Sequence, residues 1–514
     1  MPAGGERPVV LRLAGITKRF GKLVANDAID LELRAGEVMA LLGENGAGKT
    51  TLMSILFGHY VADAGEVAVA DAAGRLEPLP AGSPGAALAR GVGMVHQHFT
   101  LADNLSVLEN ITLGTEPLWR WRRRSGEARR LLDRLARDAG LEVPLDVRVG
   151  SLSVGQQQRV EILKALYRGA RILILDEPTA VLTPQETDAL FATLRRLAAQ
   201  GMAVIFISHK LGEVMALSER VAVLRGGRKV AELATAATDR ETLAETMVGR
   251  KVATPKREPM SPGAPLVELR GVSARLPGRT ALERADLTVH AHQIVGIAGV
   301  SGNGQQALSA VLAGLVAPAE GELRLAGGAW PGADPTALTS AGIGRIPEDR
   351  HLEGVVGDMT AAENLALEDY AGQECQRWGI LRGQAVRARA ERLIAGFDVR
   401  GGGPDHLTRL LSGGNMQKLI LARVLERDPR FILANQPTRG LDIGAVTYVH
   451  DRLLEARRRG AGVLLISEEL EELLTLADRI AVIYRGRLSA PIPTESLTVR
   501  ELGLMMAGQS RHAA

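Results

Sequence analysis

The sequence has 514 residues, of which 46% are hydrophobic and 24% charged, so it is long enough for two or more globular domains with sizeable cores. Lys and Arg number 62 against 59 Asp and Glu, and the resulting formal charge of +3 is too small for a protein that coats nucleic acid. The one cysteine, Cys375, excludes an internal disulfide framework and a cysteine-built zinc site, and it favours a reducing compartment.

The hydropathy pattern predicts a cytoplasmic chain without a membrane span. The opening residues lack the apolar stretch of a signal peptide, and no later run reaches the roughly 18 apolar residues that a spanning helix needs. Short apolar runs followed by turn or helix-start residues predict buried parallel strands at residues 38–42, 172–175 and 204–207. Most of the 58 glycines fall at such junctions, which favours alternating strands and helices in an α/β fold.

The first motif, GENGAGKT at residues 43–50, matches the phosphate-binding pattern G-x-x-x-x-G-K-[ST] and lies between the strand-like EVMALL and the helix-compatible TLMSILFG. Backbone N–H groups of such a loop point at phosphate oxygens beside a helix N-terminus. Lys49 would neutralise β and γ oxygens, and Thr50 would offer its hydroxyl to Mg²⁺. A glycine turn without function is the alternative.

Several later residues could complete a site for a metal-bound triphosphate. Asp176, at the end of the strand-like RILILDEP, would hold Mg²⁺ through water, and Glu177 could act as general base, with helix N-capping as the alternative for this pair. His209 could reach a γ-phosphate and Gln97 could touch both metal and water, although each of the two is ordinarily a capping or solvated residue. Phe20 could stack on adenine or pack in the core.

The sequence contains an internal repeat. GENGAGKTT, which begins at Gly43, is repeated as GVSGNGQQA, which begins at Gly299, a shift of 256 residues. LSVGQ is repeated as LSGGN, and LILDEPTAVLT as ILANQPTRGLD, each with a shift of 259 residues. Between the copies, residues 253–265 are rich in proline and charge. We therefore predict domains at residues 1–252 and 266–514 joined by a linker at 253–265. Duplication for stability alone, with no shared site, is the alternative.

At LSVGQ and LSGGN the chain resembles the ATP-binding cassette (ABC) proteins, and each half carries the full order of aromatic loop, Walker A, Gln loop, signature, Walker B, D-loop and His loop. The resemblance implies an α/β fold of two cassettes, each with a RecA-like parallel-sheet core, an antiparallel β subdomain and a helical signature subdomain. It also implies that the cassettes pack head to tail, so that each ATP lies between the Walker A of one half and the signature of the other.

This resemblance implies two composite pockets, of which the first, called site one, keeps every functional group for ATP and Mg²⁺. Its expected catalytic residues are Lys49, Gln97, Glu177 and His209, and its expected magnesium ligands are Thr50, Gln97 and Asp176. The nucleotide-binding residues would be Phe20, Gly43, Glu44, Asn45, Gly46, Ala47, Gly48, Lys49, Thr50, Thr51, Gln97 and Asp176, with Ser412, Gly413, Gly414 and Asp442 from the other half.

The second pocket, called site two, has lost these groups. Its altered positions are Leu276, Gln305, Gln306, Glu348, Asn435, Gln436 and Glu468, together with Thr183 in the D-loop of the first half. Without the lysine, and with two carboxylates where Gln and His stood, site two should bind Mg²⁺-ATP poorly. A duplication for stability alone would not keep LSGGN and Asp442 in the half whose own ATP residues are gone.

The resemblance implies the ATPase subunit of a bacterial importer, peripheral to the cytoplasmic face of the inner membrane. Two transmembrane permease subunits and a substrate-binding protein would be its partners, and no nucleic acid. HQHF at residues 96–99 and NQPTRGLD from Asn435 are typical of the nucleoside-uptake branch, and import of simple sugars such as ribose or xylose is the alternative. A soluble double-cassette ATPase acting on ribosomes or DNA is an alternative of another class.

Residues 97–149 are expected to form the helical subdomain that meets the membrane subunits, with coupling through Gln97 and, in the second half, Glu348. The run WRWRRR at residues 119–124 is interpreted as a solvated face, with membrane or nucleic-acid contact as the alternative.

Overall fold

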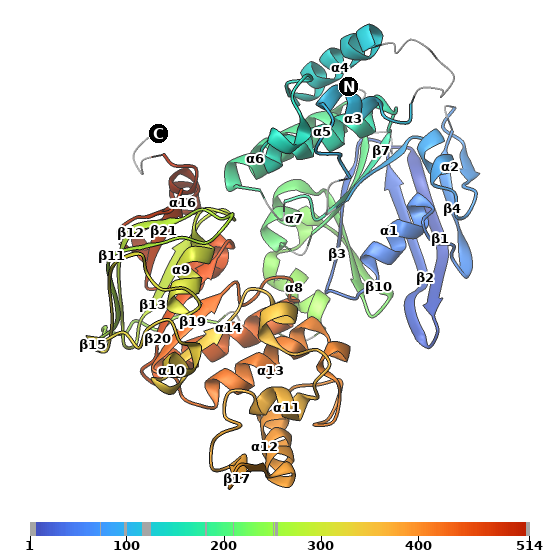
Figure 1. Cartoon of the computed structure of the whole chain (residues 1–514). Coiled ribbons are helices and arrows are strands. Elements are labelled where there is room, and N and C mark those ends of the chain that lie inside the picture. The colour runs from blue at the N-terminus through green and yellow to red at the C-terminus, as the bar shows by residue number, and fades with distance from the viewer. Residues whose placement is uncertain are drawn as a thin grey trace. The chain divides into compact units, whose positions relative to one another are not determined.

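The computed structural model describes residues 7–71, 73–96, 100–115, 125–179, 182–208, 210–249, 251 and 255–509 (Figure 1). The chain divides into two compact units, Met1–Val252 (unit 1) and Ala253–Ala514 (unit 2). Within the described ranges, no helix combines the length and the apolar character needed to cross a membrane.

Unit 1 is built on a six-stranded sheet with strand order β10-β9-β3-β8-β7-β6. Its strands are β3 Val38–Gly43, β6 Val92–Val95, β7 Ile172–Asp176, β8 Ala203–Ile207, β9 Arg220–Arg225 and β10 Arg228–Ala234. All neighbours are parallel except β9 and β10. Every residue of β3, β7 and β8 is buried, so the three strands predicted from apolar runs are confirmed.

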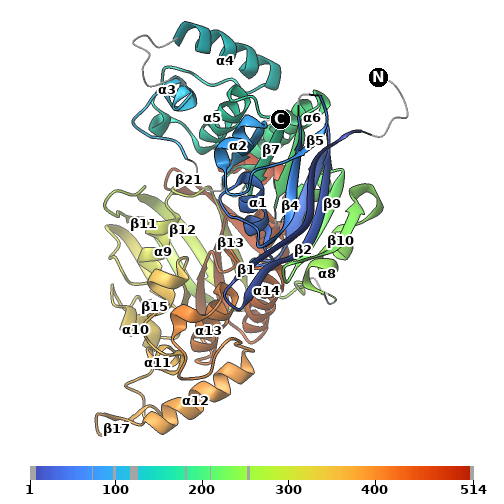
Figure 2. The ribbon, with the colours of Figure 1, turned by 90° about the vertical axis from the view of Figure 1, so that its right-hand side faces the viewer.

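A second, antiparallel sheet of unit 1 runs β2-β1-β4-β5 and lies beside α1 (Figure 2). The bounds are β1 Val9–Phe20, β2 Leu23–Arg34, β4 Ala64–Ala70 and β5 Leu76–Pro78. Leu13 and Ile29 of this sheet share a core with Leu41 and Ile174 of the central sheet. The helices near the two sheets of unit 1 are α1 Lys49–Phe57, α2 Pro84–Ala89, α6 Pro184–Ala199, α7 Leu211–Leu217 and α8 Arg240–Val248.

The helical subdomain of unit 1 consists of α3 Val107–Thr112, α4 Ser125–Ala139 and α5 Val154–Tyr167, which contact one another. The helix α5 begins within the signature LSVGQ, and the capping box of Ser153 and Gln156 explains why it begins there. The run WRWRRR lies outside the described residues, so its two interpretations stay predictions.

Unit 2 repeats this architecture. Its main sheet has the order β16-β19-β20-β13-β21-β22, formed by β13 Ile294–Ala298, β16 Ile343–Ile346, β19 Phe431–Asn435, β20 Gly462–Ser467, β21 Arg479–Tyr484 and β22 Arg487–Leu488, with β23 Ile492–Pro493 on β21. Its antiparallel sheet contains β11 Pro265–Ala274, β12 Leu282–His290, β14 Glu320–Leu325 and β15 Gly328–Ala329.

The helices of unit 2 fall into two groups. Those near the sheets are α9 Gln305–Leu312, α10 Pro335–Ser340, α14 Ile443–Arg458, α15 Leu470–Leu476 and α16 Val499–Met506. The helical subdomain contains α11 Ala361–Ala366, α12 Gly383–Gly396 and α13 Gly413–Leu425, with a hairpin of β17 Gln376–Arg377 and β18 Ile380–Leu381 before α12. Both units therefore have the parallel core, antiparallel sheet and helical subdomain that the resemblance to ABC proteins implies.

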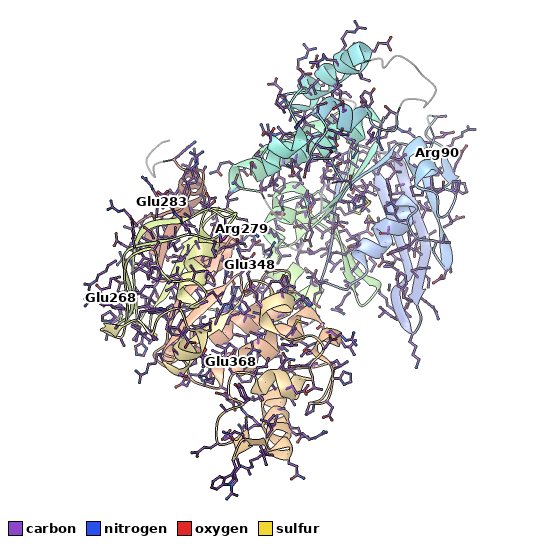
Figure 3. All side chains as sticks on the ribbon, in the orientation of Figure 1. Arg90, Glu268, Arg279, Glu283, Glu348 and Glu368 are labelled. Carbon is purple, nitrogen blue, oxygen red and sulfur yellow. The ribbon has the colours of Figure 1, made fainter. Side chains whose placement is uncertain are left out.

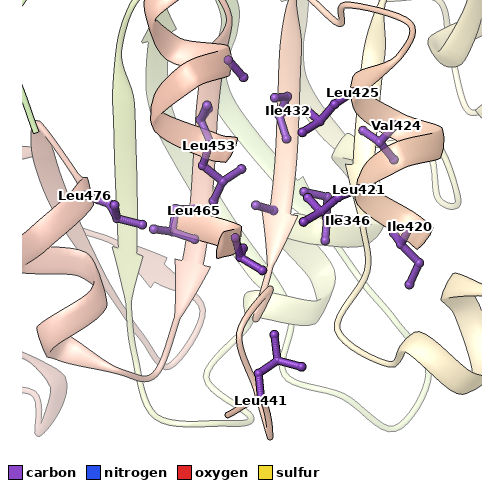
Figure 4. Close-up of a cluster of buried hydrophobic side chains, with 14 of the residues drawn as sticks. Ile346, Ile420, Leu421, Val424, Leu425, Ile432, Leu441, Leu453, Leu465 and Leu476 are labelled. Atoms are coloured by element: carbon purple, nitrogen blue, oxygen red, sulfur yellow. The ribbon is translucent and has the colours of Figure 1, made fainter. Parts of the chain in front are cut away.

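The core of unit 2 connects its functional loops to the sheet. Ile346, Ile432 and Leu465 from three neighbouring strands belong to one cluster with Leu421 of α13 (Figure 4). Leu441, in the loop before α14, is also buried in this cluster, which anchors that loop to the core.

Residues 255–263, before β11, have no regular secondary structure. Arg257 in this segment forms an ion pair with Glu495 at 2.7 Å, so the segment is attached to unit 2. Its role as a linker stays a prediction.

Candidate functional site

The loop at residues 43–48 joins the end of β3 to the start of α1, as predicted. Gly46 and Gly48 have left-handed φ angles of 84° and 98°. A Cβ atom on Gly48 would lie 2.2 Å from the carbonyl oxygen of Ala25, and one on Gly43 would lie 2.5 Å from that of Leu224. The glycines are therefore required by backbone conformation and by close packing, which distinguishes this loop from a chance turn.

Lys49 occupies the inside of this loop. Its Nζ donates hydrogen bonds to the carbonyl oxygens of Gly43 at 2.6 Å and Glu44 at 3.0 Å, and the residue is only 6% exposed. Burial lowers the pKa of Lys49, while Glu177, Asp176 and Glu44 act in the opposite direction. The ammonium group is thus held at the loop by carbonyl oxygens, a ligand type that phosphate oxygens could replace.

Asp176 and Glu177 lie where β7 ends, and the structure places them near Lys49. Asp176 is 8% exposed, and burial together with the neighbouring Glu177 raises its pKa, which Lys49 opposes. A divalent cation bound at Asp176 would stabilise the ionised form of this carboxylate. The residues present therefore fit Mg²⁺ and a triphosphate.

The N-capping alternative for this acid pair is wrong. The next helix, α6, begins at Pro184, and Thr183 is its N-cap. Glu177 instead has a left-handed φ of 46°, and its N–H donates to the carbonyl oxygen of Ile207 at 3.0 Å. Such a left-handed φ is strained for a residue other than glycine, and strained residues are common at functional sites.

Three further predicted residues have different outcomes. Gln97 and His209 lie outside the described residues, but they follow β6 and β8, which end at the same edge of the parallel sheet as β3 and β7. Phe20 is 45% exposed at the end of β1, and its ring meets that of Tyr60 edge-on at 5.6 Å. Core packing therefore does not describe Phe20, whereas Leu276 packs against the core of unit 2.

In unit 2 the equivalent loop is closed by its own side chains. The Gln305 amide donates to the carbonyl oxygen of Val300 at 2.8 Å and accepts from the N–H of Asn303 at 2.9 Å. It thus uses a backbone N–H of the kind that a phosphate-binding loop offers to its ligand. Thr50 of unit 1 is exposed at the start of α1, whereas Gln306, at the matching position, offers an amide in place of its hydroxyl.

Asn435 and Gln436, at the end of β19, correspond to Asp176 and Glu177. They have the same backbone geometry but no negative charge. Gln436 has a φ of 49° and donates its N–H to Ile466 at 2.8 Å, which is the geometry of Glu177. The side-chain amide of Asn435 donates to the hydroxyl of Ser309 at 3.4 Å instead of presenting a carboxylate. The fold is therefore preserved here where the acidic chemistry is not.

The sequence predicts two carboxylates in site two, Glu348 and Glu468, and the structure places an arginine beside both of them. Arg439 forms an ion pair with Glu348, which follows β16 and is labelled in Figure 3. Burial and the neighbouring Glu348 raise the pKa of Glu468, and Arg439 opposes this shift. Sequence reasoning overlooked Arg439, although its arginine stands where unit 1 has Ala180.

The signature and D-loop of unit 2 lie next to each other. Ser412 caps α13 and accepts from the side-chain amide of Asn415 at 2.8 Å, while Asp442 caps α14 through the N–H of Ala445 at 2.7 Å. A Cβ on Gly414 would lie 3.8 Å from Oδ2 of Asp442. Because the hydroxyl of Ser412 accepts in the cap, its O–H remains a donor.

The two units also differ in the signature itself. Val154 stands in unit 1 where unit 2 has Gly413, and it is 40% exposed. This difference was available in the sequence as LSVGQ against LSGGN. The structure thus gathers Lys49, Asp176 and Glu177 in unit 1, and Ser412, Gly414 and Asp442 in unit 2. Together these features define a P-loop ATPase whose cassette is duplicated.

Comparisons with known proteins agree with this class. The family model described as ABC transporter matches residues 26–180 and 282–439. The chain is 44% identical to the glucose import ATP-binding protein TsgD13 of Haloferax volcanii, over 98% of this chain and 96% of that protein. It is 43% identical to the nucleoside import ATP-binding protein NupA of Lactococcus lactis (97% and 98% covered) and 44% identical to the guanosine import ATP-binding protein NupO of Bacillus subtilis (98% of each).

The chain therefore belongs to the ABC transporter family, as an ATPase with two cassettes. Among solved structures, a protein described as RNase-L Inhibitor matches 96% of this chain and 93% of its own with a TM-score of 0.64. At 19% identity this likeness shows the fold alone.

Proposed function

We propose that the chain hydrolyses ATP at site one and that site two does not hydrolyse it. Lys49 and the N–H groups of the loop at residues 43–48 bind the phosphates, and Phe20 stacks on the adenine. Mg²⁺, held by Thr50, Gln97 and Asp176, would neutralise charge on the β and γ oxygens. Glu177 accepts the proton of the attacking water, and His209 reaches the γ-phosphate. Ser412, Gly413, Gly414 and Asp442 of unit 2 complete the site.

The asymmetry of the two units carries this proposal. Unit 1 keeps the acid pair and the lysine but has Val154 and Thr183 in its signature and D-loop. Unit 2 has replaced its lysine and acid pair but keeps the glycines of the signature and Asp442. Unit 1 has thus retained the residues that bind and hydrolyse ATP, and unit 2 has retained the signature and the D-loop. This pattern is expected if the two retained sets form one composite site.

We propose that ATP turnover drives the import of nucleosides. The nucleoside and guanosine importers NupA and NupO support this cargo at 43% and 44% identity over nearly the full chain. Import of simple sugars is the second candidate, and the equally similar glucose importer TsgD13 favours it. The chain would lie at the cytoplasmic face of the inner membrane, bound to two permease subunits that receive cargo from a binding protein. Its likeness to the RNase-L Inhibitor structure gives no support for work on ribosomes, because it shows the fold alone.

The composite site can be tested with a matched pair of serine variants. Ser153 and Ser412 both cap the signature helix of their unit, so Ser153→Ala and Ser412→Ala should cost similar helix stability, about 1 kcal/mol each. Ser412→Ala should lower the ATPase rate of the full chain at least about tenfold, because a donor to the transferring phosphate is lost. Ser153→Ala should leave the rate nearly unchanged. Equal losses, or a greater loss in Ser153→Ala, would exclude the proposed pairing.

The cargo can be tested through the partners. Purifying the chain with its membrane subunits, and identifying the ligand that copurifies with the associated binding protein, should give a nucleoside. A binding protein that holds ribose, xylose or glucose and no nucleoside would assign the sugar alternative.

A further inference from the structure

The segment that follows β16 contains two charged side chains that hold the same residue. Glu348 forms an ion pair with the guanidinium of Arg439. Arg350 donates from Nη2 to the main-chain carbonyl oxygen of Arg439 at 2.5 Å. The side chain and the backbone of Arg439 are therefore both fixed from one segment, directly before Leu441 and Asp442 of the D-loop.

Arg350 also touches the signature. A Cβ built on Gly413 would lie 3.7 Å from Cζ of Arg350, and one built on Gly440 would lie 3.2 Å from its Nη2. The guanidinium thus lies between the first glycine of the signature and the glycine that opens the D-loop. Gly440 has a left-handed φ of 66°, so this turn has little tolerance for a side chain.

The charge of Arg350 is poorly compensated within unit 2. Asp349 favours the charged form of Arg350, but that carboxylate accepts from the N–H groups of His351 and Leu352 and caps the π-helical turn Arg350–Gly354. Among the described residues, no carboxylate forms an ion pair with Arg350. Burial lowers the pKa of Arg350, and the nearby Arg439 acts in the same direction. Burying this cation between two loops costs desolvation free energy. An apolar side chain of similar size would fill the same space without that cost.

Unit 1 has none of these groups. Aligned by the repeat, Glu348 corresponds to Gln97, Arg350 to Phe99 and Arg439 to Ala180. Val154 stands at the position of Gly413, where its side chain would meet the space that Arg350 fills in unit 2. We call Glu348, Arg350 and Arg439 together the bracket. These three charged residues therefore occur only in the unit whose signature and D-loop are proposed to serve the intact ATP residues.

We propose that Arg350 and the ion pair of Glu348 and Arg439 are positioning residues that hold the signature and the D-loop of unit 2 in the arrangement required for ATP hydrolysis at site one. This inference rests on the proposed composite site. The segment after β16 is also the one through which the helical subdomain begins, so the bracket links that subdomain to both loops. Charge-assisted hydrogen bonds supply the strength and direction that such a link needs.

The test compares Arg350→Gln and Glu348→Gln with a control, Arg387→Gln. The control breaks the exposed ion pair between Arg387 of α12 and Asp405, which follows that helix in the same unit. The two bracket variants should lower kcat of the full chain about tenfold, with half-saturating ATP changed by less than about twofold, because ATP is first bound by the intact unit 1 loop. The control should match the parent.

A charge reversal keeps the test decisive if a single variant folds poorly. Arg439→Glu alone should lose activity like Glu348→Gln, and the double variant Glu348→Arg with Arg439→Glu should recover at least about half of the parental kcat, since it restores opposite charges. A purely structural role would instead lower the melting temperature in proportion to activity.

Two outcomes separate this inference from the proposed function. Bracket variants with parental kcat, in a chain that Ser412→Ala inactivates, would overturn the bracket and leave the composite site standing. An active Ser412→Ala chain would overturn the composite site and, with it, the role given to the bracket.

Discussion

Replacing Glu177 by Gln should lower the rate of ATP hydrolysis without lowering the stability of the fold, because unit 2 already has Gln436 at this position. Gln436 adopts a φ of 49° and donates its N–H at 2.8 Å, where Glu177 has 46° and 3.0 Å. The substitution removes one negative charge and adds no bulk. We therefore expect Glu177→Gln to fold as the parent does, with a melting temperature within about 2 °C.

The expected loss of activity follows from the role of a general base. Removing such a base costs about 10²- to 10⁴-fold in rate, which corresponds to roughly 3–5 kcal/mol of transition-state stabilisation. ATP binding should be kept or strengthened, because Glu177 raises the pKa of Asp176 and its removal favours the ionised, metal-binding form of that carboxylate.

The assay is phosphate release by the full chain at saturating Mg²⁺-ATP, together with equilibrium binding of a fluorescent ATP analogue. Gln436→Ala is the control, since site two should contribute no hydrolysis, and it should keep the parental rate within about twofold. Equal losses in the two variants would refute the asymmetry. A Glu177→Gln chain with more than about a tenth of the parental rate would refute the assignment of the base.

Four other substitutions test the site in unit 1. Lys49→Ala should abolish tight ATP binding and transport, and uptake that persists in a reconstituted transporter would contradict the phosphate-binding role. Burial raises the pKa of Asp176, so this carboxyl binds its proton more tightly in the native state than in the unfolded chain. The free energy of unfolding therefore falls as the pH rises from the ordinary pKa of an aspartate through the raised value in the native state. Asp176→Asn, the residue found at Asn435, should therefore stabilise the nucleotide-free protein by about 0.5–2 kcal/mol at neutral pH while abolishing Mg²⁺-dependent turnover, and a lower melting temperature would contradict this. Gly48→Ala should lower the free energy of unfolding by more than about 2 kcal/mol, because its Cβ would meet a carbonyl of β2 at 2.2 Å, whereas Gly46→Ala, with open space at its Cβ, should cost only about 1 kcal/mol in urea unfolding.

Much of this protein follows from the sequence alone. The apolar runs identify β3, β7 and β8, because a strand buried on both faces must be apolar throughout. The glycine-rich loop and the acid pair follow such strands directly, so their place at the edge of the sheet needs no tertiary information. The repeat, with its shifts of 256 and 259 residues, predicts that unit 2 has the same fold.

Only the tertiary structure decided which charges are compensated. Arg439 lies 91 residues after Glu348, and no local pattern connects them, yet the fold pairs their side chains. The placement of Arg350 against Gly413 and Gly440 likewise depends on where β16, α13 and the D-loop meet. Hydropathy and motif spacing report on neighbours along the chain, whereas the strength of an ion pair depends on distance and burial in space.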